Sequence, residues 1–168
     1  TLNAGGEVNE AAARLIRSGV RMQSLLDGLV DFNRTQLGLG IRVERRPGDA
    51  AEFCASELDA VRTAHPSRRM DLMVHGDCRG LWDGERIGQM VGNLLINAVK
   101  YSTADAAIRI TVAGGERDVI IDVTNEGVPS DPAELSTLFE PLRRSGVHAP
   151  ESASLGLGLF IAREIAHA

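Results

Sequence analysis

Hydrophobic residues recur at a seven-residue spacing between Asn9 and Leu37, which predicts a long amphipathic helix. One row contains Leu15, Met22 and Leu29, a second contains Leu25 and Phe32, and three further positions widen the stripe: Leu26, Val30 and Leu37. A single helix with so wide an apolar face is not stable alone. We therefore expect it to pack on partner helices, in the same chain or in a homodimer. The alternative is an ordinary surface helix docked on the domain that follows.

Shorter elements follow the glycines at positions 38 and 40, which are expected to end this helix. The pattern predicts a strand at residues 41–45, a turn at 47–48, a helix capped by Asp49 and reaching about Thr63, strands at 70–74 and 79–82, and a helix at 84–101. Alternating apolar residues on either side of Gly114 and Gly115 predict a hairpin of strands 108–112 and 119–123.

These elements do not alternate regularly as strand, helix and strand, which argues against a doubly wound fold. The predicted fold class is α+β. We expect a two-layer α/β sandwich, with a mixed, largely antiparallel sheet and helices on one face. It is preceded by the long helix of a dimeric helical bundle.

Composition and charge limit the classes of partner that the chain is expected to bind. The chain has 168 residues, and its 18 basic and 23 acidic side chains give a net charge of −5, so we expect no nucleic-acid partner and no membrane contact. Cys54 and Cys78 lack metal-binding spacing and are predicted to be buried free thiols. Without an apolar run long enough to span a bilayer, the chain is expected to be a soluble, cytoplasmic piece of a longer protein, whether or not that protein is membrane-anchored.

The helix predicted at residues 84–101 has a polar face as well as an apolar one. Its polar side holds Gln89, Asn93, Asn97, Lys100 and Tyr101. Asparagine is a poor helix former, so two of them one turn apart need a reason. An amide oxygen can complete the shell of a Mg²⁺ held mainly by phosphate oxygens and water, a lysine can meet a phosphate, and a tyrosine offers a flat face to a base. A solvated helix face is the alternative.

Two later segments suit a nucleotide as well, although each is weak evidence by itself. Asn125 lies at a strand end beside Gly127, where an amide can offer a donor and an acceptor to the edge of a purine. Gly156 and Gly158 open the last predicted helix, and glycines there expose backbone N–H groups to an anion.

The order and spacing of these pieces resembles the catalytic domain of sensor histidine kinases, in the ATPase superfamily shared with gyrase, a heat-shock chaperone and mismatch-repair proteins. The matching segments are the asparagine box at 93–102, a first glycine box at 125–127, a phenylalanine box at 139–141 and a second glycine box at 156–159. The resemblance covers residues 41 to 168, with the family's last strands expected beyond Ala168. Residues 9 to 37 resemble the second helix of the preceding dimerisation domain, so the expected division is 1–39 and 40–168.

The resemblance implies a role for each of these segments. Asn97 would ligate Mg²⁺, Asn93 and Lys100 would face the ribose and phosphates, and Tyr101 would line the adenine with Asn125 and Gly127. Arg143 and Arg144, which open a lid, would face the terminal phosphate. Backbone at Gly156, Leu157 and Gly158 would hold the phosphates. The chain departs from the family in having Asn125 for an aspartate, and Pro129 and Ser154 for glycines.

The implied reaction transfers the γ-phosphoryl of ATP to a histidine and then to an aspartate on a response-regulator receiver domain. The acceptor is expected outside this chain, because no histidine in it has the family's H-[ED]-x-x-x-P surroundings. Three alternatives stay open. A hydrolysing ATPase would need a carboxylate where Gln89 stands. A serine kinase of the anti-sigma type would lack the long first helix, and a degenerate nucleotide-binding module would only scaffold a partner.

Overall fold

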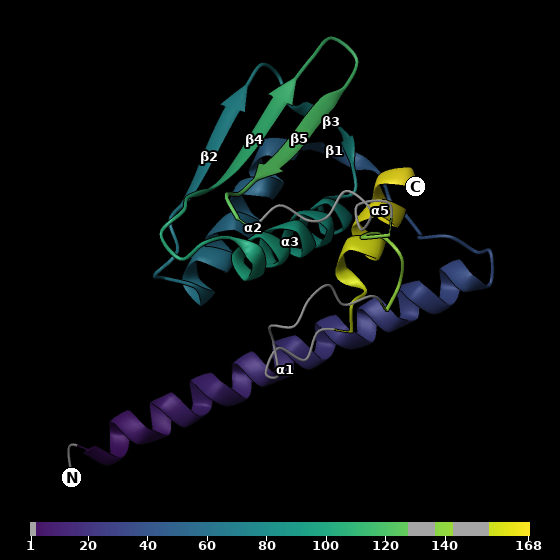
Figure 1. Ribbon diagram of the computed structural model, residues 1–168. Coiled ribbons are helices and arrows are strands. Elements are labelled where there is room, and N and C mark those ends of the chain that lie inside the picture. Colours follow the sequence, from purple (N-terminus) through teal and green to yellow (C-terminus); the bar gives the residue numbers. More distant parts are fainter. Residues whose placement is uncertain (1–2, 128–136, 143–154) are drawn as a thin grey trace.

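The computed structural model describes residues 3–127, 137–142 and 155–168, and Figure 1 shows a long helix lying against a sheet-and-helix domain. The elements in chain order are α1 (Asn3–Gln36), β1 (Arg46–Asp49), α2 (Ala50–Ala64), β2 (Met70–His75), β3 (Arg79–Trp82), α3 (Gly84–Tyr101), β4 (Ile108–Gly114), β5 (Val119–Thr124) and α5 (Gly158–His167). The helices predicted at 84–101 and after Asp49 are confirmed, as is the hairpin of β4 and β5.

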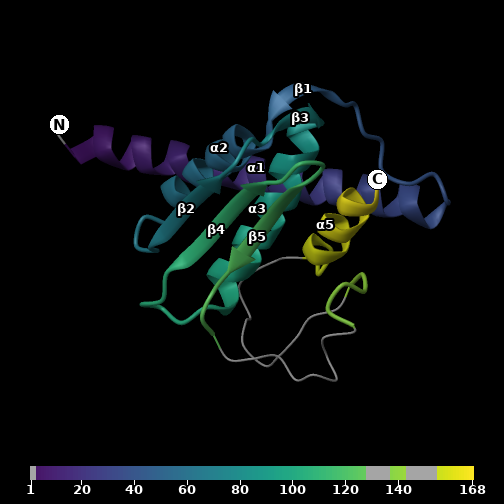
Figure 2. The same cartoon turned by 90° about the horizontal axis from the view of Figure 1, so that it is seen from above.

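The main sheet has the strand order β2-β4-β5, with β2 parallel to β4 and β4 antiparallel to β5. Helices α2 and α3 lie together against one of its faces (Figures 1 and 2). The core between them is built from alternate residues of β4 and one side of each helix: Cys54, Leu58, Val91, Leu95, Ile108, Ile110 and Val112. The mixed sheet with helices on one face is therefore confirmed.

Helix α3 has strong local signals at both ends. Asp83 caps its first turn by accepting a hydrogen bond from the backbone N–H of Arg86, at 3.1 Å. The same carboxylate also accepts from the backbone N–H of Glu44, before β1, at 2.7 Å. Ser102 ends it by donating its own N–H to Ala98, at 2.9 Å. Between these caps the buried residues follow the helical repeat: Ile87, Val91, Leu95 and Ala98. The polar face is thereby held away from the sheet.

The strand predicted at residues 41–45 is wrong, and so is the turn predicted at 47–48. Ile41 and Val43 alternate as in a strand, but they pack instead in a second hydrophobic cluster with α5. Strand β1 begins at Arg46 and pairs antiparallel with β3 through Pro47 and Gly48. Proline is tolerated there because β1 is paired on one side only in this two-stranded sheet.

The two thiols are buried and free, as predicted. Burial, together with the neighbouring Cys78 and Asp49, raises the pKa of Cys54 to about 11. Cys54 is therefore a protonated core residue at neutral pH. Among the described residues, no helix combines the length and apolar character that a membrane crossing needs.

Removing the cap of α3 should have a measurable, pH-dependent effect. Burial raises the pKa of Asp83, but the N–H groups of Glu44 and Arg86 and the Arg86 charge outweigh it and hold that pKa below its ordinary value. We expect Asp83→Ala to lower the free energy of unfolding by about 1 kcal/mol at neutral pH. Urea unfolding measures this difference.

The sign of the pH dependence follows from the lowered pKa. Asp83 makes its full contribution to the free energy of unfolding above the ordinary aspartate pKa of about 4. That contribution is lost as the pH falls through the lower pKa that Asp83 has in the folded protein. Asp59→Ala is the control, because its carboxylate is exposed and forms an ion pair with Arg62 on the helix surface. Equal losses in the two variants would contradict the capping role.

Candidate functional site

The polar face of α3 presents two asparagine amides. Asn93 and Asn97 are half-buried, one turn apart, and neither side chain makes a hydrogen bond within the described part of the chain. Lys100 and Tyr101 are exposed at the end of the same helix, with the lysine Nζ 5.0 Å from the centre of the tyrosine ring. Half-buried amides without protein partners are available to a polar ligand.

The end of β5 is joined to the end of α3. Ser102 and Gly127 form an antiparallel bridge, and the Thr103 N–H donates to the Glu126 carbonyl at 2.9 Å. A Cβ at Gly127 would overlap the carbonyl oxygen of Tyr101, so only glycine allows this close approach. The structure thus brings Asn125 and Gly127 to the Tyr101 end of the polar face.

The start of α5 lies beside the same face. Its N-cap residue, Leu157, makes no side-chain hydrogen bond to the first turn, so that turn relies on other acceptors for its N–H groups. A Cβ at Gly158 would lie 3.2 Å from the Asn93 amide oxygen, which shows how near the helix start is to Asn93. An uncapped helix N-terminus beside an amide suits an anion.

Gly156, just before α5, has a φ of +68°, a conformation that favours glycine. Its carbonyl accepts a hydrogen bond from the N–H of Leu142 at 3.1 Å, so the chain returns to the same place after residues 143–154. Arg143 and Arg144, predicted to face a terminal phosphate, lie outside the described residues, as do Pro129 and Ser154.

The residues present fit a magnesium nucleotide. The free amides of Asn93 and Asn97 can meet a cation or a hydroxyl, and the uncapped start of α5 can meet phosphates. Tyr101 and Asn125 stand at the opposite end, where a base can stack and form hydrogen bonds. The arrangement could therefore accommodate the parts of a nucleotide in order along α3.

Comparison with known proteins decides the family. Residues 82–168 match the model described as the histidine kinase-, DNA gyrase B- and HSP90-like ATPase. The match includes the asparagine box, the phenylalanine box and both glycine boxes. The chain belongs to this ATPase family. Within it, the sensor protein kinase CarS of Pseudomonas aeruginosa is 35% identical over 157 residues, covering 88% of the chain and 34% of that protein. The sensor histidine kinase GlrK of Escherichia coli is 30% identical over 165 residues, covering 94% of the chain and 33% of GlrK.

The chain spans about a third of the length of these two sensor kinases. Among solved structures, full-length ShkA in complex with AMPPNP has the same fold, with a TM-score of 0.69 at 22% identity, over 95% of the chain and 33% of ShkA. The resemblance to the ATP-binding catalytic region of sensor histidine kinases is confirmed.

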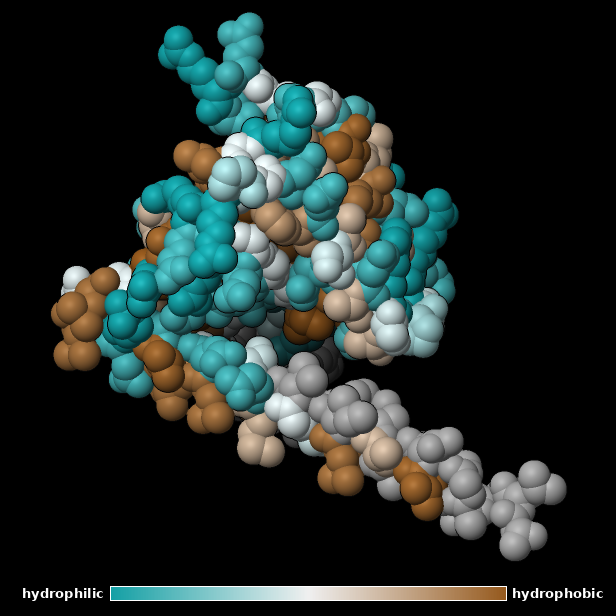
Figure 3. All heavy atoms as spheres, turned by 180° about the vertical axis from the view of Figure 1, so that it is seen from behind, coloured by the Kyte–Doolittle hydropathy of each residue, from teal (hydrophilic) through white to brown (hydrophobic). Residues whose placement is uncertain are grey.

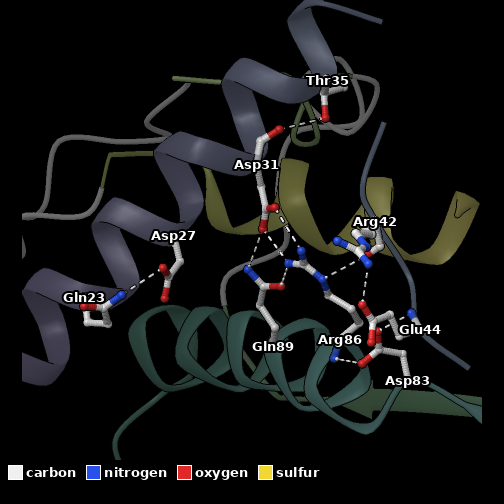
Figure 4. Close-up of polar contacts among 9 residues, drawn as sticks. All are labelled: Gln23, Asp27, Asp31, Thr35, Arg42, Glu44, Asp83, Arg86 and Gln89. Carbon is white, nitrogen blue, oxygen red and sulfur yellow. Dashed lines mark hydrogen bonds and ion pairs between the residues drawn. The ribbon is translucent and has the colours of Figure 1, made fainter. Parts of the chain in front are cut away.

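Gln89, on the polar face predicted for α3, has protein partners of its own. It donates to the carboxylate of Asp31, on α1, at 3.0 Å (Figure 4). Its own oxygen accepts from Arg86 at 2.6 Å. The charged groups of Asp31 and Arg86 therefore occupy the Gln89 amide, and helical periodicity alone could not predict these contacts.

Asp31 is a residue that the sequence pattern did not single out. It is only 3% exposed, and Arg86 donates to both of its carboxylate oxygens, at 2.6 and 3.2 Å. The paired geometry is that of a strong arginine–carboxylate contact. It joins α1 to the first turns of α3, the helix that carries Asn93 and Asn97 (Figure 4).

The next residue along α1 makes a second contact with the ATPase domain. The Phe32 ring meets the Phe160 ring of α5 edge to face, with ring centres 5.7 Å apart. Ile41, Leu157, Ile161 and Ile165 complete the cluster around them. Helix α1 is thus attached both to α3 and to α5.

A cleft of about 1170 Å³ lies between α1 and the N-terminal end of α3. Its walls include Asp27, Asp31, Arg42, Trp82 and Arg86, and none of those described residues that are predicted to hold the nucleotide. The free amides of α3 and the start of α5 therefore identify the candidate nucleotide site better than the cleft does.

Proposed function

We propose that this chain is the part of a sensor histidine kinase that binds Mg-ATP and delivers its γ-phosphoryl group to a histidine outside residues 1–168. In the whole protein the group then passes to an aspartate on a response-regulator receiver domain, in the cytoplasm. The main support is the meeting of three elements at one place: the amides of α3, the start of α5 and the end of β5. The match to the ATPase family supports nucleotide use independently.

Each group has a role that its chemistry suits. Asn97 would complete the shell of Mg²⁺, and Asn93 and Lys100 would bind the ribose and phosphates. Bound Mg²⁺ would supply charge neutralisation for phosphoryl transfer. Tyr101, Asn125 and Gly127 would hold the adenine, while the backbone from Gly156 to Gly158 would donate N–H groups to the phosphates.

Arg143 and Arg144 remain candidates for the terminal phosphate, on the family resemblance alone. We assign no general base, since positioning and charge neutralisation account for most catalysis of phosphoryl transfer.

We also propose that α1 forms the homodimer. Its exposed apolar side chains continue along one helix and include Leu15, which is 74% exposed, and Met22, which is 61% exposed. Figure 3 shows such side chains in brown along the projecting helix. A second copy of α1 would cover them, as expected for a bundle helix.

A hydrolysing ATPase is disfavoured by the state of Gln89. An amide cannot act as a general base, and this one is already engaged by Asp31 and Arg86.

The proposed reaction is tested with the intact protein that contains this chain, incubated with Mg-ATP labelled at the γ-phosphate. We expect label on the protein that is stable to alkali and released by acid, as for a phosphohistidine, and its transfer to an added receiver domain. Leu81→Ala, a change at a side chain that is exposed on β3, is the control.

Each alternative predicts a different product. Acid-stable label would identify a serine kinase, and free phosphate without labelled protein would identify an ATPase. Absence of both, with no nucleotide binding, would identify a scaffold. Any of these three results would overturn the histidine-kinase proposal.

A further inference from the structure

The C-terminal end of α3 is held by an arginine from a distant loop. Arg68 lies in the turn between α2 and β2, and its guanidinium Nη1 donates to the carbonyls of Thr103 and Ala104, each at 2.8 Å. Its Nη2 reaches the Ser102 carbonyl at 3.3 Å, the Val99 carbonyl at 3.5 Å and the Ser102 hydroxyl oxygen. One side chain therefore meets the last turn of α3 and the loop directly after it.

The Arg68 contacts supply hydrogen-bond donors to carbonyl groups at the C-terminal end of α3. The last carbonyls of a helix have no partners within it, and a positive charge there also interacts favourably with the helix dipole. Arginine suits this place because its planar guanidinium presents several donors in fixed directions. A lysine carries the same charge but only one nitrogen.

The base of the Arg68 side chain is fixed on both sides. The backbone N–H of Arg68 donates to the His65 carbonyl at 3.0 Å. The backbone carbonyl of the next residue, Arg69, accepts from the N–H of Ile108, at the start of β4, at 2.9 Å. The guanidinium is thus fixed to the sheet, and through it so is the end of α3.

The same few residues connect Arg68 to the candidate nucleotide site. Ser102, which Arg68 contacts, forms the bridge with Gly127, and Thr103 binds Glu126. Tyr101 and Lys100 directly precede this junction. Moving the Ser102–Ala104 segment would therefore displace the tyrosine and the Asn125–Gly127 segment together.

We propose that Arg68 is a positioning residue of the nucleotide site: it holds the end of α3 and the Ser102–Ala104 segment so that Tyr101, Asn125 and Gly127 meet the base. This inference rests on the proposed nucleotide site. Arg68 does not touch the nucleotide itself; it acts through Ser102 and the loop that follows.

The test measures Mg-ATP binding to the 168-residue chain by calorimetry, together with the NMR signals of Tyr101, which is the only tyrosine and so needs no assignment. We expect Arg68→Ala to weaken binding roughly tenfold and to reduce the shift of the Tyr101 ring signals on adding Mg-ATP. Arg68→Lys should recover only part of the affinity, because one nitrogen cannot replace the two that donate here.

The adjacent arginine supplies the matched control. Arg69 has an exposed side chain that forms an ion pair with Asp71, so Arg69→Ala should bind Mg-ATP within twofold of the parent chain. Thermal unfolding of every variant ensures that binding is compared between folded proteins. A merely structural role would lower the melting temperature of Arg68→Ala but leave both the affinity and the Tyr101 shift of the folded protein unchanged.

Two outcomes overturn the inference while leaving the nucleotide site in place. One is binding by Arg68→Ala as tight as by Arg69→Ala. The other, decisive if Arg68→Ala does not fold, is full affinity in Arg68→Lys. If the parent chain binds no Mg-ATP, or binds it equally well after Asn97→Ala, the proposed nucleotide site itself fails and the role of Arg68 fails with it.

Discussion

Replacing Asn97 with alanine should weaken Mg-ATP binding by about a hundredfold, since even groups that only orient a metal's ligands are worth roughly 10- to 100-fold in affinity. The Asn97 amide is half-buried on α3 and has no hydrogen-bond partner among the described residues. Its removal therefore breaks no contact within the described domain, and the loss should fall on ligand binding. Calorimetry with Mg-ATP measures it.

The metal dependence makes this expectation specific. With a chelator present, the parent and Asn97→Ala should bind ATP alike, because the proposed role of the amide is to ligate Mg²⁺. Ile96→Ala is the control on the same helix, since Ile96 is exposed and lies next to Asn97. Equal affinity of the parent and Asn97→Ala for Mg-ATP would refute the assignment of the metal ligand.

Replacing Asp31 with alanine should weaken the attachment of α1 to the ATPase domain by about 3 kcal/mol. Asp31 is 3% exposed, while the Arg86 side chain is 24% exposed, so the variant leaves a partly buried guanidinium without its carboxylate. The amide of Gln89 loses its acceptor as well. We expect faster hydrogen exchange in the last turns of α1 and in α5.

Asp27 provides the matched control for this variant. It lies one turn earlier on α1, is exposed, and accepts one hydrogen bond from Gln23 at 2.9 Å. Asp27→Ala should change exchange little, because exposed polar contacts contribute little. Adding Arg86→Ala to Asp31→Ala should recover part of the loss, since no uncompensated charge then remains. Unchanged exchange in Asp31→Ala would show that the pair does not hold α1.

Local patterns predicted the elements that have local causes. The bounds of α3 follow from the Asp83 cap and from a helical repeat of buried residues, and the hairpin follows from alternation around Gly114 and Gly115. The asparagine pair is predicted as a ligand-facing group, and on α3 neither amide has a hydrogen-bond partner among the described residues. The individual site roles stay predictions.

Long-range pairing could not be predicted in this way. Ile41 and Val43 alternate like a strand, yet they pack against the apolar side of α5 and lie in no strand. Nothing local to β2 shows that it lies parallel to β4, a strand about 38 positions later. Helical angle predicts Gln89 on the polar face of α3, but it could not predict that the buried Asp31 of α1 accepts a hydrogen bond from it.

The neighbouring contacts of Asp31 and Phe32 determine how far α1 can slide along its own axis. A shift of one turn, about 5.4 Å, moves each position into the place of the residue four earlier or later. Four residues before Asp31, a rise of about 6 Å and slightly more than one turn, stands another aspartate, Asp27, so Arg86 could find a carboxylate again after such a shift. Four residues before Phe32 stands Gly28, which has no side chain to meet Phe160. The ion pair alone would therefore permit two axial registers, and the aromatic pair selects one of them.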